Sequence, residues 1–528
     1  MLTILGLVLL PFLGLIGIAF SGSLSAWPHL MANVLPRSLF QTFSLLFLVA
    51  LGTSLIGAGT AWLVSIFEFP LRRFLVWALV LPLAVPTYIA AYTQLEFFDF
   101  SGPVQFLVRE IGGYTTFKDY WFPDLRSLWG AALVFSLVLY PYVYMTTRLT
   151  FARQGASALD ACRSLGAKPS RMFWHIGLPM ARPALAAGVA IALMETLNDI
   201  GAVEILGVRT LTYAIFETWL NRDDLVGAVQ LAIMLLVIIA FLVWSERKAR
   251  GERNYSATSR ERPPARLHLT GVRKWLAVAA CALPIAFGLG VPLYILGTYS
   301  LRRFGEGLDG IILHAAFNSI LVATISAIIA TGIAYGVIQY ARLSRNKRVA
   351  TTGRIASLGY AVPGTVLAIG LLIPLASFDN WLDAALRTNF NISSGLLLSG
   401  SIGILVYAYV LRFLAISYGT VETGFGRVSP HIDLVARSLG RTPSQVATQI
   451  HTPIMKTVLA VSFLLVFVDS MKELSATLLL RPFNFETLST YIYDRASQSA
   501  LEEASFAALI IVVIGLAPVY LVSRVPQK

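Results

Sequence analysis

The sequence is poor in charged residues and in cysteine. Only 13% of its 528 residues are Asp, Glu, Lys or Arg, whereas 56% are hydrophobic and the mean hydropathy is +0.72. Soluble globular domains carry about 25% charged residues, so the composition excludes that class and indicates a membrane protein. The two cysteines, Cys162 and Cys281, are too few for a disulfide framework or a Cys-x-x-Cys metal site, and we interpret both as packing residues.

Motifs for covalent chemistry are also absent from the sequence. It contains no Gly-x-x-x-x-Gly-Lys-Ser/Thr phosphate loop and no His-Glu-x-x-His motif. Its six histidines are dispersed, and no two have the spacing of a helical metal site. We therefore predict no catalytic residue, no metal site and no cofactor. Any ATP hydrolysis coupled to this chain must come from another polypeptide.

Apolar runs long enough to cross a bilayer, which takes about 20 helical residues, recur along the chain. We count twelve, near 2–20, 40–66, 74–95, 127–147, 183–204, 225–244, 275–300, 316–340, 355–376, 393–416, 457–479 and 505–524. The sequence therefore predicts an all-α integral membrane protein with about 12 transmembrane helices.

Basic residues gather in short segments between these runs rather than on one continuous face. The segment 246–274 contains nine of them, and 342–354 is basic without any acid. The positive-inside rule places both segments in the cytoplasm, so the net charge of +13 reflects membrane orientation and not nucleic-acid binding. With an even number of spans, both termini are expected in the cytoplasm, and the loop from about 96 to 126 on the opposite side.

One loop pattern occurs twice. Asp160-Ala161-Cys162-Arg163-Ser164-Leu165-Gly166 precedes Ile176-Gly177-Leu178-Pro179, and Leu434-Val435-Ala436-Arg437-Ser438-Leu439-Gly440 precedes Ile450-His451-Thr452-Pro453, each after nine residues. The second copy follows the first by 274 positions, and both lie between the fourth and fifth runs of a six-run half. We predict two parallel six-helix repeats, at 1–244 and 274–528, joined by a basic cytoplasmic linker at 245–273.

Glycine and proline positions predict the shape of this loop. Gly166 and Gly440 permit the left-handed conformation that ends a helix, and a proline three residues later suits the first turn of the next helix. Pro179 and Pro453 are expected to stop that second helix before the chain re-enters the membrane. The result would be a rigid helix-turn-helix that can transmit a displacement.

Each loop resembles the EAA loop of ABC-importer permeases, whose pattern is roughly Glu-Ala-Ala, three residues, Gly, nine residues, Ile-x-Leu-Pro. The resemblance implies the type I importer (MetI-like) fold and an ABC ATPase homodimer docked on segments 157–179 and 431–453. The coupling residues that it implies are Asp160, Ala161, Gly166, Ile176, Pro179, Ala436, Gly440, Ile450 and Pro453. His175 and His451, close to the loop isoleucines, are expected on the same coupling surface. Leu434 replaces the glutamate in the second copy, which leaves open whether both loops couple equally.

Over nearly the whole chain the resemblance is closest to the fused permeases of ferric iron importers. The segments that carry it are Leu81-Pro-Leu-Ala-Val-Pro86, Tyr360-Ala-Val-Pro363-Gly, Met194-Glu195-Thr-Leu-Asn198-Asp199 and Asp469-Ser-Met-Lys472-Glu473. It implies import of Fe3+ delivered by a periplasmic ferric-binding protein, across a bacterial inner membrane. Thiamine and phosphonate importers have related fused permeases, so these substrates remain alternatives.

Ionisable residues occur inside the fifth and eleventh runs. A charge at such depth costs at least about 2.5 kcal/mol, so these side chains should face other helices or a water-filled cavity. They form two groups, each expected on one helix face: Glu195 with Asp199, and Asp469 with Lys472 and Glu473. Two interpretations stay open. The groups line the translocation pathway, or they fix helix packing through buried hydrogen bonds.

Pro86 and Pro363 occupy matched positions in the third and ninth runs. Each lacks an amide hydrogen and is expected to kink or break its helix, either as a packing kink or as a gate hinge.

Two functions of other classes compete with a permease. An ion-coupled secondary transporter could use the buried acids as cation sites, and its transport would survive loss of the ATPase. An intramembrane transferase or hydrolase would need catalytic motifs that the sequence lacks. Neither explains the doubled loop, which favours a permease that alternates between inward-open and outward-open states.

Overall fold

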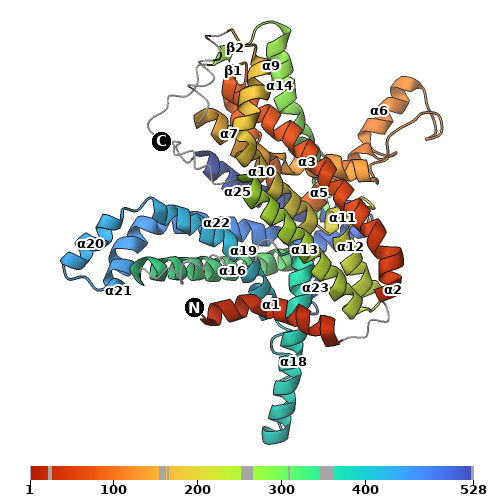
Figure 1. Cartoon of the computed structure of the whole chain (residues 1–528). Coiled ribbons are helices and arrows are strands. Elements are labelled where there is room, and N and C mark those ends of the chain that lie inside the picture. Colours follow the sequence, from red (N-terminus) through yellow and green to blue (C-terminus); the bar gives the residue numbers. More distant parts are fainter. Residues whose placement is uncertain are drawn as a thin grey trace. The chain divides into compact units, whose positions relative to one another are not determined.

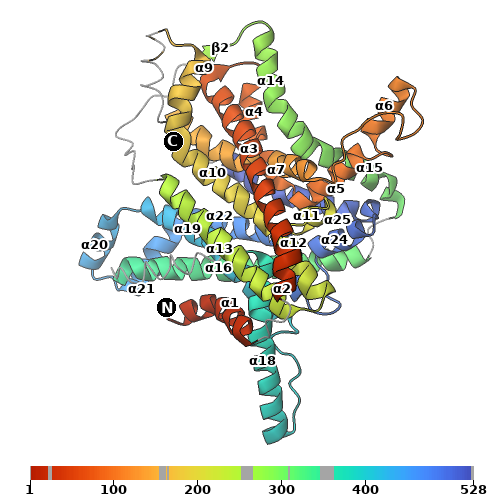
Figure 2. The ribbon, with the colours of Figure 1, turned by 45° about the vertical axis from the view of Figure 1, so that its right-hand side comes forward.

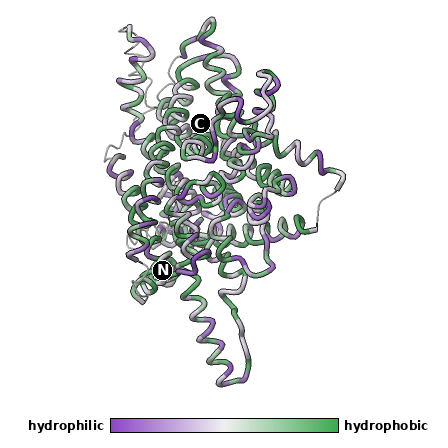
Figure 3. The backbone as a smooth tube through the Cα atoms, turned by 90° about the vertical axis from the view of Figure 1, so that its right-hand side faces the viewer, coloured by the Kyte–Doolittle hydropathy of each residue, from purple (hydrophilic) through white to green (hydrophobic). Residues whose placement is uncertain are grey.

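The computed structural model describes residues 2–21, 27–153, 162, 164, 166–250, 266–306, 310–344 and 362–524. Within these ranges the secondary structure is helical, apart from two short parallel strands, β1 (Phe67–Glu68) and β2 (Leu267–His268). Ten helices are long and apolar enough to cross a membrane, or eleven if one bent helix pair counts as a span. Figure 3 shows hydrophobic residues distributed along the long helices. The predicted all-α membrane class is confirmed, and the observed count is close to the expected twelve.

The helices form two compact units. Unit 1 comprises Met1–Ser25, Asp223–Ile233 and Glu306–Asp494, and unit 2 comprises Ala26–Arg222, Met234–Gly305 and Arg495–Lys528. Each unit therefore combines most of one predicted repeat with the first helix of the other. In unit 1, α1 packs against α18, and in unit 2, α15 packs against α5 (Figures 1 and 2).

The helices are labelled in chain order. Unit 2 contains α2 (Trp27–His29), α3 (Leu35–Ile66), α4 (Arg72–Ala78), α5 (Thr87–Phe98), α6 (Pro103–Gly112), α7 (Leu128–Arg153), α9 (Pro169–Met172), α10 (Leu178–Asn198), α11 (Gly201–Ile205), α12 (Leu211–Phe216), α14 (Val272–Ile285), α15 (Val291–Arg302) and α25 (Leu501–Arg524). Unit 1 contains α1 (Leu2–Ser21), α16 (Gly310–Ser344), α18 (Gly364–Phe390), α19 (Ile402–Gly426), α20 (Pro430–Ser438), α21 (Pro443–Gln445), α22 (Thr452–Lys472) and α23 (Ser475–Leu480). The unit boundaries pass through α13 (Leu225–Arg250) and α24 (Leu488–Ser497).

The predicted linker is partly structured. Helix α13 continues to Arg250, so the first residues of the linker are helical. Residues 251–265 lie outside the described part of the chain. Beyond them, β2 pairs with β1, and Arg266 Nη1 lies 3.4 Å from Glu68 Oε2. The C-terminal end of the linker is therefore fixed to unit 2.

The central helices of the two units pack through small residues. In unit 2, α3 approaches α7 so closely that a Cβ at Gly57 would lie 2.7 Å from Val143. In unit 1, the buried hydroxyl of Thr331 on α16 lies 3.4 Å from that of Ser417 on α19 and 3.3 Å from that of Ser462 on α22. Small residues permit this approach, which membrane helices need because lipid provides no hydrophobic driving force between them.

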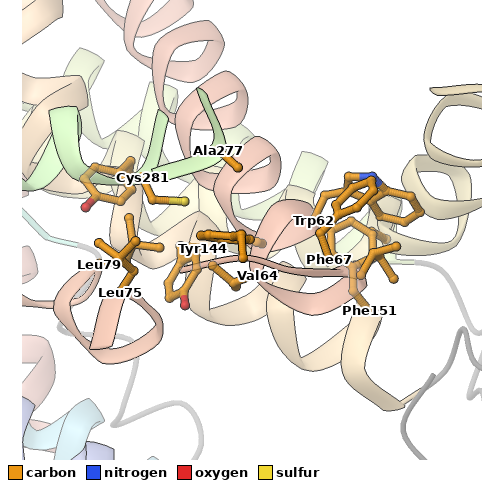
Figure 4. Packing of buried hydrophobic residues seen from close by; sticks show 14 of the residues in the cluster. Trp62, Val64, Phe67, Leu75, Leu79, Tyr144, Phe151, Ala277 and Cys281 are labelled. Carbon is orange, nitrogen blue, oxygen red and sulfur yellow. The ribbon is translucent and has the colours of Figure 1, made fainter. Parts of the chain in front are cut away.

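An aromatic and aliphatic cluster fills the interior of unit 2 where α3, α7 and α14 meet (Figure 4). Trp62 and Phe67 contribute from the end of α3 and β1, Tyr144 and Phe151 from α7, and Cys281 from α14. The Tyr144 hydroxyl donates to the carbonyl of Val76 at 2.7 Å, so its polar end is also satisfied. Cys281 is fully buried in this cluster and acts as a packing residue.

A π-helical turn precedes a proline in four helices. These turns are η2 (Leu30–Val34), η4 (Phe173–Gly177), η6 (Ala286–Gly290) and η9 (Val446–His451), followed by Pro36, Pro179, Pro292 and Pro453. The residue before each proline donates to the carbonyl five positions back, as Leu178 does to Phe173. This wider turn makes room for the proline ring, which would clash with the carbonyl four residues back.

The expectation that Pro179 and Pro453 stop a helix is therefore wrong. The helical segments Pro169–Asn198 and Pro443–Lys472 are continuous through these prolines. The π turn absorbs the missing hydrogen bond, which the sequence rule for proline does not anticipate. Each segment is a single rod that begins in the predicted coupling loop and ends beside the buried acids.

The contact of α1 with α18 can be tested. It is the contact that joins the first helix of the first predicted repeat to unit 1. A Cβ at Gly14 would lie 2.7 Å from Pro374 Cγ and would also meet the backbone of Gly370, whereas one at Gly17 would meet nothing within 4 Å. We expect Gly14→Ala to lower the free energy of unfolding by about 1–3 kcal/mol through overpacking. Resistance of the purified protein to SDS-induced unfolding measures this, with Gly17→Ala on the same helix as control. Equal stability of the two variants would contradict the close contact.

Candidate functional site

The two predicted coupling loops share one backbone geometry. Gly166 and Gly440 have φ of +75° and +76°, the expected left-handed conformation. The next amide in each loop bonds back over five residues, from Ala167 to Cys162 at 3.0 Å and from Arg441 to Ala436 at 3.1 Å. This is the hydrogen bond of a Schellman motif, which satisfies the last carbonyls of a helix. Asp160 and Ala161 lie outside the described residues.

The second helix of each loop starts at the predicted proline. Pro169 and Pro443 occupy the first turn. In the second loop, Thr442 and Gln445 form a capping box, while Lys168 at the matched position provides no side-chain cap. The loop isoleucines, Ile176 and Ile450, are half-buried, and Ala436 is buried. These predicted coupling residues therefore hold the loop together.

Other side chains make up the outer surface of the loops. Leu434 and Val435 on α20 and Leu439 directly after it are exposed, and Leu439 exposes 75% of its surface. In the first loop, Trp174 is exposed in the same way. Exposed apolar residues on a short rigid element are typical of a surface that another protein covers.

An aromatic contact anchors the first loop. The ring of Trp62 packs edge-on against Phe151 and Phe173, at centroid distances of 5.2 and 5.3 Å. The same ring covers Gly177, where a Cβ would lie only 2.6 Å from it. Gly177 is thus the position that lets the rod formed by η4 and α10 (Leu178–Asn198) rest against α3.

A polar network anchors the second loop. The imidazole of His451 is fully buried, with Nε2 2.6 Å from Asp433 Oδ1 and Nδ1 2.7 Å from Nε2 of Gln339. The guanidinium of Arg342 donates to the other oxygen of Asp433 at 2.7 Å. Burial alone would raise the pKa of Asp433, but the hydrogen bonds from Arg342 and His451 outweigh it and hold this pKa below its usual value.

The two anchors occupy matched positions in the predicted repeats. Gly177 and His451 are 274 positions apart, and Trp62 and Gln339 are 277 apart. In the first loop the Trp62 ring packs on Gly177. In the second loop the side-chain amide of Gln339 contacts the imidazole of His451 at the matched positions. The expectation that His451 belongs to the coupling surface is wrong, because its ring is fully buried among Gln339 and Asp433. His175 is exposed.

The two prolines of the third and ninth runs have the same backbone conformation. Pro86 and Pro363 both have φ of −57° and ψ of 142°, and each immediately precedes a helix, α5 or α18. At Pro86 the helical segments Arg72–Ala84 and Thr87–Gly112 bend by 98°. The residues before Val362 are outside the described ranges, so only the helix start can be compared at Pro363.

A carboxylate ties the end of the first rod to this break. Asp199 directly follows α10, and its Oδ1 accepts the amide of Ala202 at 2.7 Å in the first turn of α11. Its other oxygen accepts a hydrogen bond from the hydroxyl of Thr87, the residue after Pro86. One side chain therefore joins α10, α11 and the start of α5.

Glu473 does the same in unit 1, 274 positions after Asp199. It follows α22, and its Oε1 accepts the amide of Ala476 at 2.9 Å and the Nη1 of Arg412 at 2.6 Å. A Cβ at Gly364, the residue after Pro363, would lie 2.8 Å from this oxygen. The Arg412 and Glu473 side chains expose only 7% and 5% of their surface. We call the contacts of Asp199 and Glu473 the acid latches.

The other predicted intramembrane charges lie close to the latches. Glu195, Asp469 and Lys472 are half-buried on the last turns of α10 and α22. Asp199 does not share a helix face with Glu195 as expected, because its backbone is extended so that its carboxylate can cap α11. The sequence analysis missed Arg412. The feature that could have revealed it is a single arginine inside the tenth apolar run.

No metal site emerges from the described part of the chain. Among the residues searched there, no group of three or more His, Cys, Asp or Glu side chains could hold an ion. What the arrangement offers is mechanical: each unit has a loop, a continuous rod, an acid at the end of that rod and a helix that starts directly after a proline.

Comparison with known proteins identifies the family. Residues 53–248 match the family model of the binding-protein-dependent transport system inner membrane component. The chain is also 26% identical to an Fe(3+)-transport system permease protein of Haemophilus influenzae, over 93% of this chain and 90% of the relative. This chain is a permease of the binding-protein-dependent ABC transporter family. Like other permease subunits of that family, it has no ATPase site of its own and is a multi-pass inner-membrane protein.

Further relatives of the permease differ in coverage. A probable ABC transporter permease protein of Sinorhizobium fredii is 21% identical over 90% of this chain and 85% of the relative. A probable sulfate transport system permease protein of Chlorokybus atmophyticus is 28% identical, but over 39% of this chain and 71% of the relative.

The first loop anchor can be tested at Gly177. An added methyl at this position would press on the Trp62 ring, while one at Gly59, also helical, would meet nothing within 4 Å. We expect Gly177→Ala to cost about 1–3 kcal/mol of stability, and Gly59→Ala to be neutral or stabilising. Adding Trp62→Leu should recover part of the loss, because the smaller side chain makes room. Thermal unfolding in detergent measures all three, and no recovery would argue against this contact.

The second latch can be tested by removing one charge or both. Glu473→Gln leaves the buried Arg412 without its carboxylate, so we expect a loss of about 3–5 kcal/mol in stability. Replacing both residues with methionine should restore most of it. Asp199→Asn, at the matched position, should cost less because the Thr87 hydroxyl and the Ala202 amide that donate to this acid are uncharged. If Glu473→Gln and Asp199→Asn are equally mild, the ion pair is not the main support of the latch.

Proposed function

We propose that this permease imports Fe3+, which a periplasmic ferric-binding protein delivers and an ABC ATPase homodimer drives. One observation supports Fe3+ as the substrate. The alignment with the Fe(3+)-transport permease covers 93% of this chain and 90% of that relative, so it includes both predicted repeats. The sulfate permease relative aligns with 39% of this chain, which supports the permease fold of one half.

The duplicated hydrogen bonds support the two predicted repeats. In unit 2 the amide of Leu211 donates to Thr42 on α3 at 2.9 Å, and in unit 1 the amide of Leu488 donates to Ser319 on α16 at 2.7 Å. The donor and the acceptor of the second hydrogen bond each lie 277 positions after their counterparts in the first. We propose repeats at 1–244 and 274–528 that together supply both halves of the pathway, with the linker at 245–273 in the cytoplasm.

Coupling would start at the loops. ATP binding displaces the segments 157–179 and 431–453, and the continuous rods carry this displacement to Asp199 and Glu473. The acid latches transmit this displacement to the helices that start after Pro86 and Pro363. The pathway then opens to the opposite side of the membrane. For ATP to drive this change, the free energy of docking on the loops must differ between the inward-open and outward-open states.

Sulfate is the second candidate substrate, because single-repeat sulfate permeases are among the relatives. Fe3+ and sulfate have opposite charge, so one pathway is not expected to serve both. Thiamine and phosphonate remain alternatives implied by the resemblance of the sequence. All four can be compared in one uptake assay.

The test is uptake into proteoliposomes that contain this chain, its ATPase and its binding protein. We expect ATP-dependent uptake of 55Fe3+. We further expect Leu439→Asp to lower both uptake and coupled ATP hydrolysis about tenfold or more, because a charge replaces an exposed apolar docking residue. Ser444→Asp is the control, since it adds the same charge to an exposed position on the other helix of the loop.

The outcomes separate the alternatives. ATP-driven uptake of sulfate, thiamine or phosphonate without iron would keep the permease and replace the substrate. Iron uptake that ignores ATP and collapses with the proton gradient would indicate a secondary transporter. Normal uptake by Leu439→Asp would remove the docking role of α20.

A further inference from the structure

Helix α6 (Pro103–Gly112) turns Gln105 and Arg109 toward its own chain. Gln105 donates from Nε2 to the carbonyl of Phe98 at 2.8 Å and accepts a hydrogen bond from the hydroxyl of Tyr120. Arg109 donates from Nη1 to the carbonyl of Phe100 at 2.6 Å, and its guanidinium lies 4.0 Å from the centroid of that ring. The polar face is therefore occupied by contacts within the segment.

The apolar face of α6 points outward. Phe106, Leu107 and Ile111 expose 58%, 55% and 80% of their surface, and no residue of the helix is buried. A helix on a water-facing surface has the reverse arrangement, with its apolar stripe against the core. Figures 1 and 2 show α6 projecting beyond α5, the helix it contacts, and no described residue of this unit buries that face.

The loop that follows α6 adds residues typical of a membrane interface. Trp121 and Phe117 expose 85% and 67% of their surface, and Lys118 lies over the Phe117 ring at 5.8 Å. Tryptophan concentrates at the level of the lipid headgroups, where one side of the ring system is apolar and the other wet. The turn itself is ordered, since Asp119 Oδ2 accepts the amides of Thr115 and Thr116 at 2.9 and 2.7 Å.

The chain also holds α6 at the edge of the membrane. It starts five residues after α5 ends, within the apolar bent pair, and the next spanning helix begins at Leu128. With ten residues, α6 is about 15 Å long, which is too short to cross a bilayer but sufficient to lie along its surface. Residues 99–126 carry three basic and four acidic side chains, so no strong charge attracts a protein partner.

We propose that α6 is an interfacial helix whose face of Phe106, Leu107 and Ile111 lies in the lipid bilayer, with Trp121 at the headgroup level. Such a helix binds by burying its apolar face at the boundary between headgroups and acyl chains. The occupant of the exposed apolar face is thus lipid. This inference does not depend on which solute the permease carries.

The test places a spin label on each side of α6 in the full chain, reconstituted in lipid nanodiscs. Cys162→Ser and Cys281→Ala remove the native thiols, and single labels are attached in the variants Ile111→Cys, Leu107→Cys and Arg109→Cys. The ratio of collision rates with oxygen and with a water-soluble nickel chelate reports depth in the bilayer. We expect this ratio to be several-fold higher at positions 107 and 111 than at control position 109, which lies on the opposite side of the helix.

Two results would overturn the proposal. Equal nickel accessibility at positions 107, 109 and 111 would place the apolar face in water. Protection of positions 107 and 111 that arises only on addition of the binding protein would identify a protein docking surface instead. Two labelled positions on the apolar face keep the test decisive if one of the variants fails to assemble.

Discussion

Lipid offers no hydrogen bonds, so every interruption of a membrane helix must satisfy its own backbone groups. The two rods of this permease show how that is done without losing length. A π turn before Pro179 and before Pro453 keeps the helix continuous, and a carboxylate at its far end receives the first amides of the next short helix. The helical pattern is thus interrupted only at the π turn near the loop and at the acid latch. The helix between these two points stays rigid.

The two loops reach the same backbone geometry on different supports. Aromatic packing of Trp62 on Gly177 depends on shape alone, whereas His451, Gln339 and Asp433 form a network of hydrogen bonds and charge. Because the pKa of Asp433 is lowered in the folded chain, its contribution to stability is present above the usual carboxyl range and is lost only in acid. Loops with the same backbone geometry can therefore differ in what holds each of them.

Local rules explain what the sequence could predict. Glycine at a helix end and proline at a helix start each act over a few residues, so the helix-turn-helix and its positive φ values followed from spacing. The pairing of Arg412 with Glu473 joins residues 61 positions apart, and Gln339 with His451 joins residues 112 apart. Such contacts depend on which helices pack together, and no spacing rule contains that information. The prediction that Pro179 ends a helix is wrong for a different reason. The π turn compensates for the amide hydrogen that proline lacks, so the helix continues.

The exchanged first helices give the two predicted repeats a direct mechanical link. In unit 1, α1 contacts α18, the helix that starts at Pro363, and in unit 2, α15 contacts α5, the helix that starts at Pro86. The start of each of these two helices therefore lies against an acid of its own predicted repeat, and each helix also packs against the first helix of the other predicted repeat. A displacement of one rod must then strain both repeats, because densely packed contacts such as Gly14 on Gly370 do not yield gradually. Fusion of the two repeats in one chain keeps these exchanged partners together.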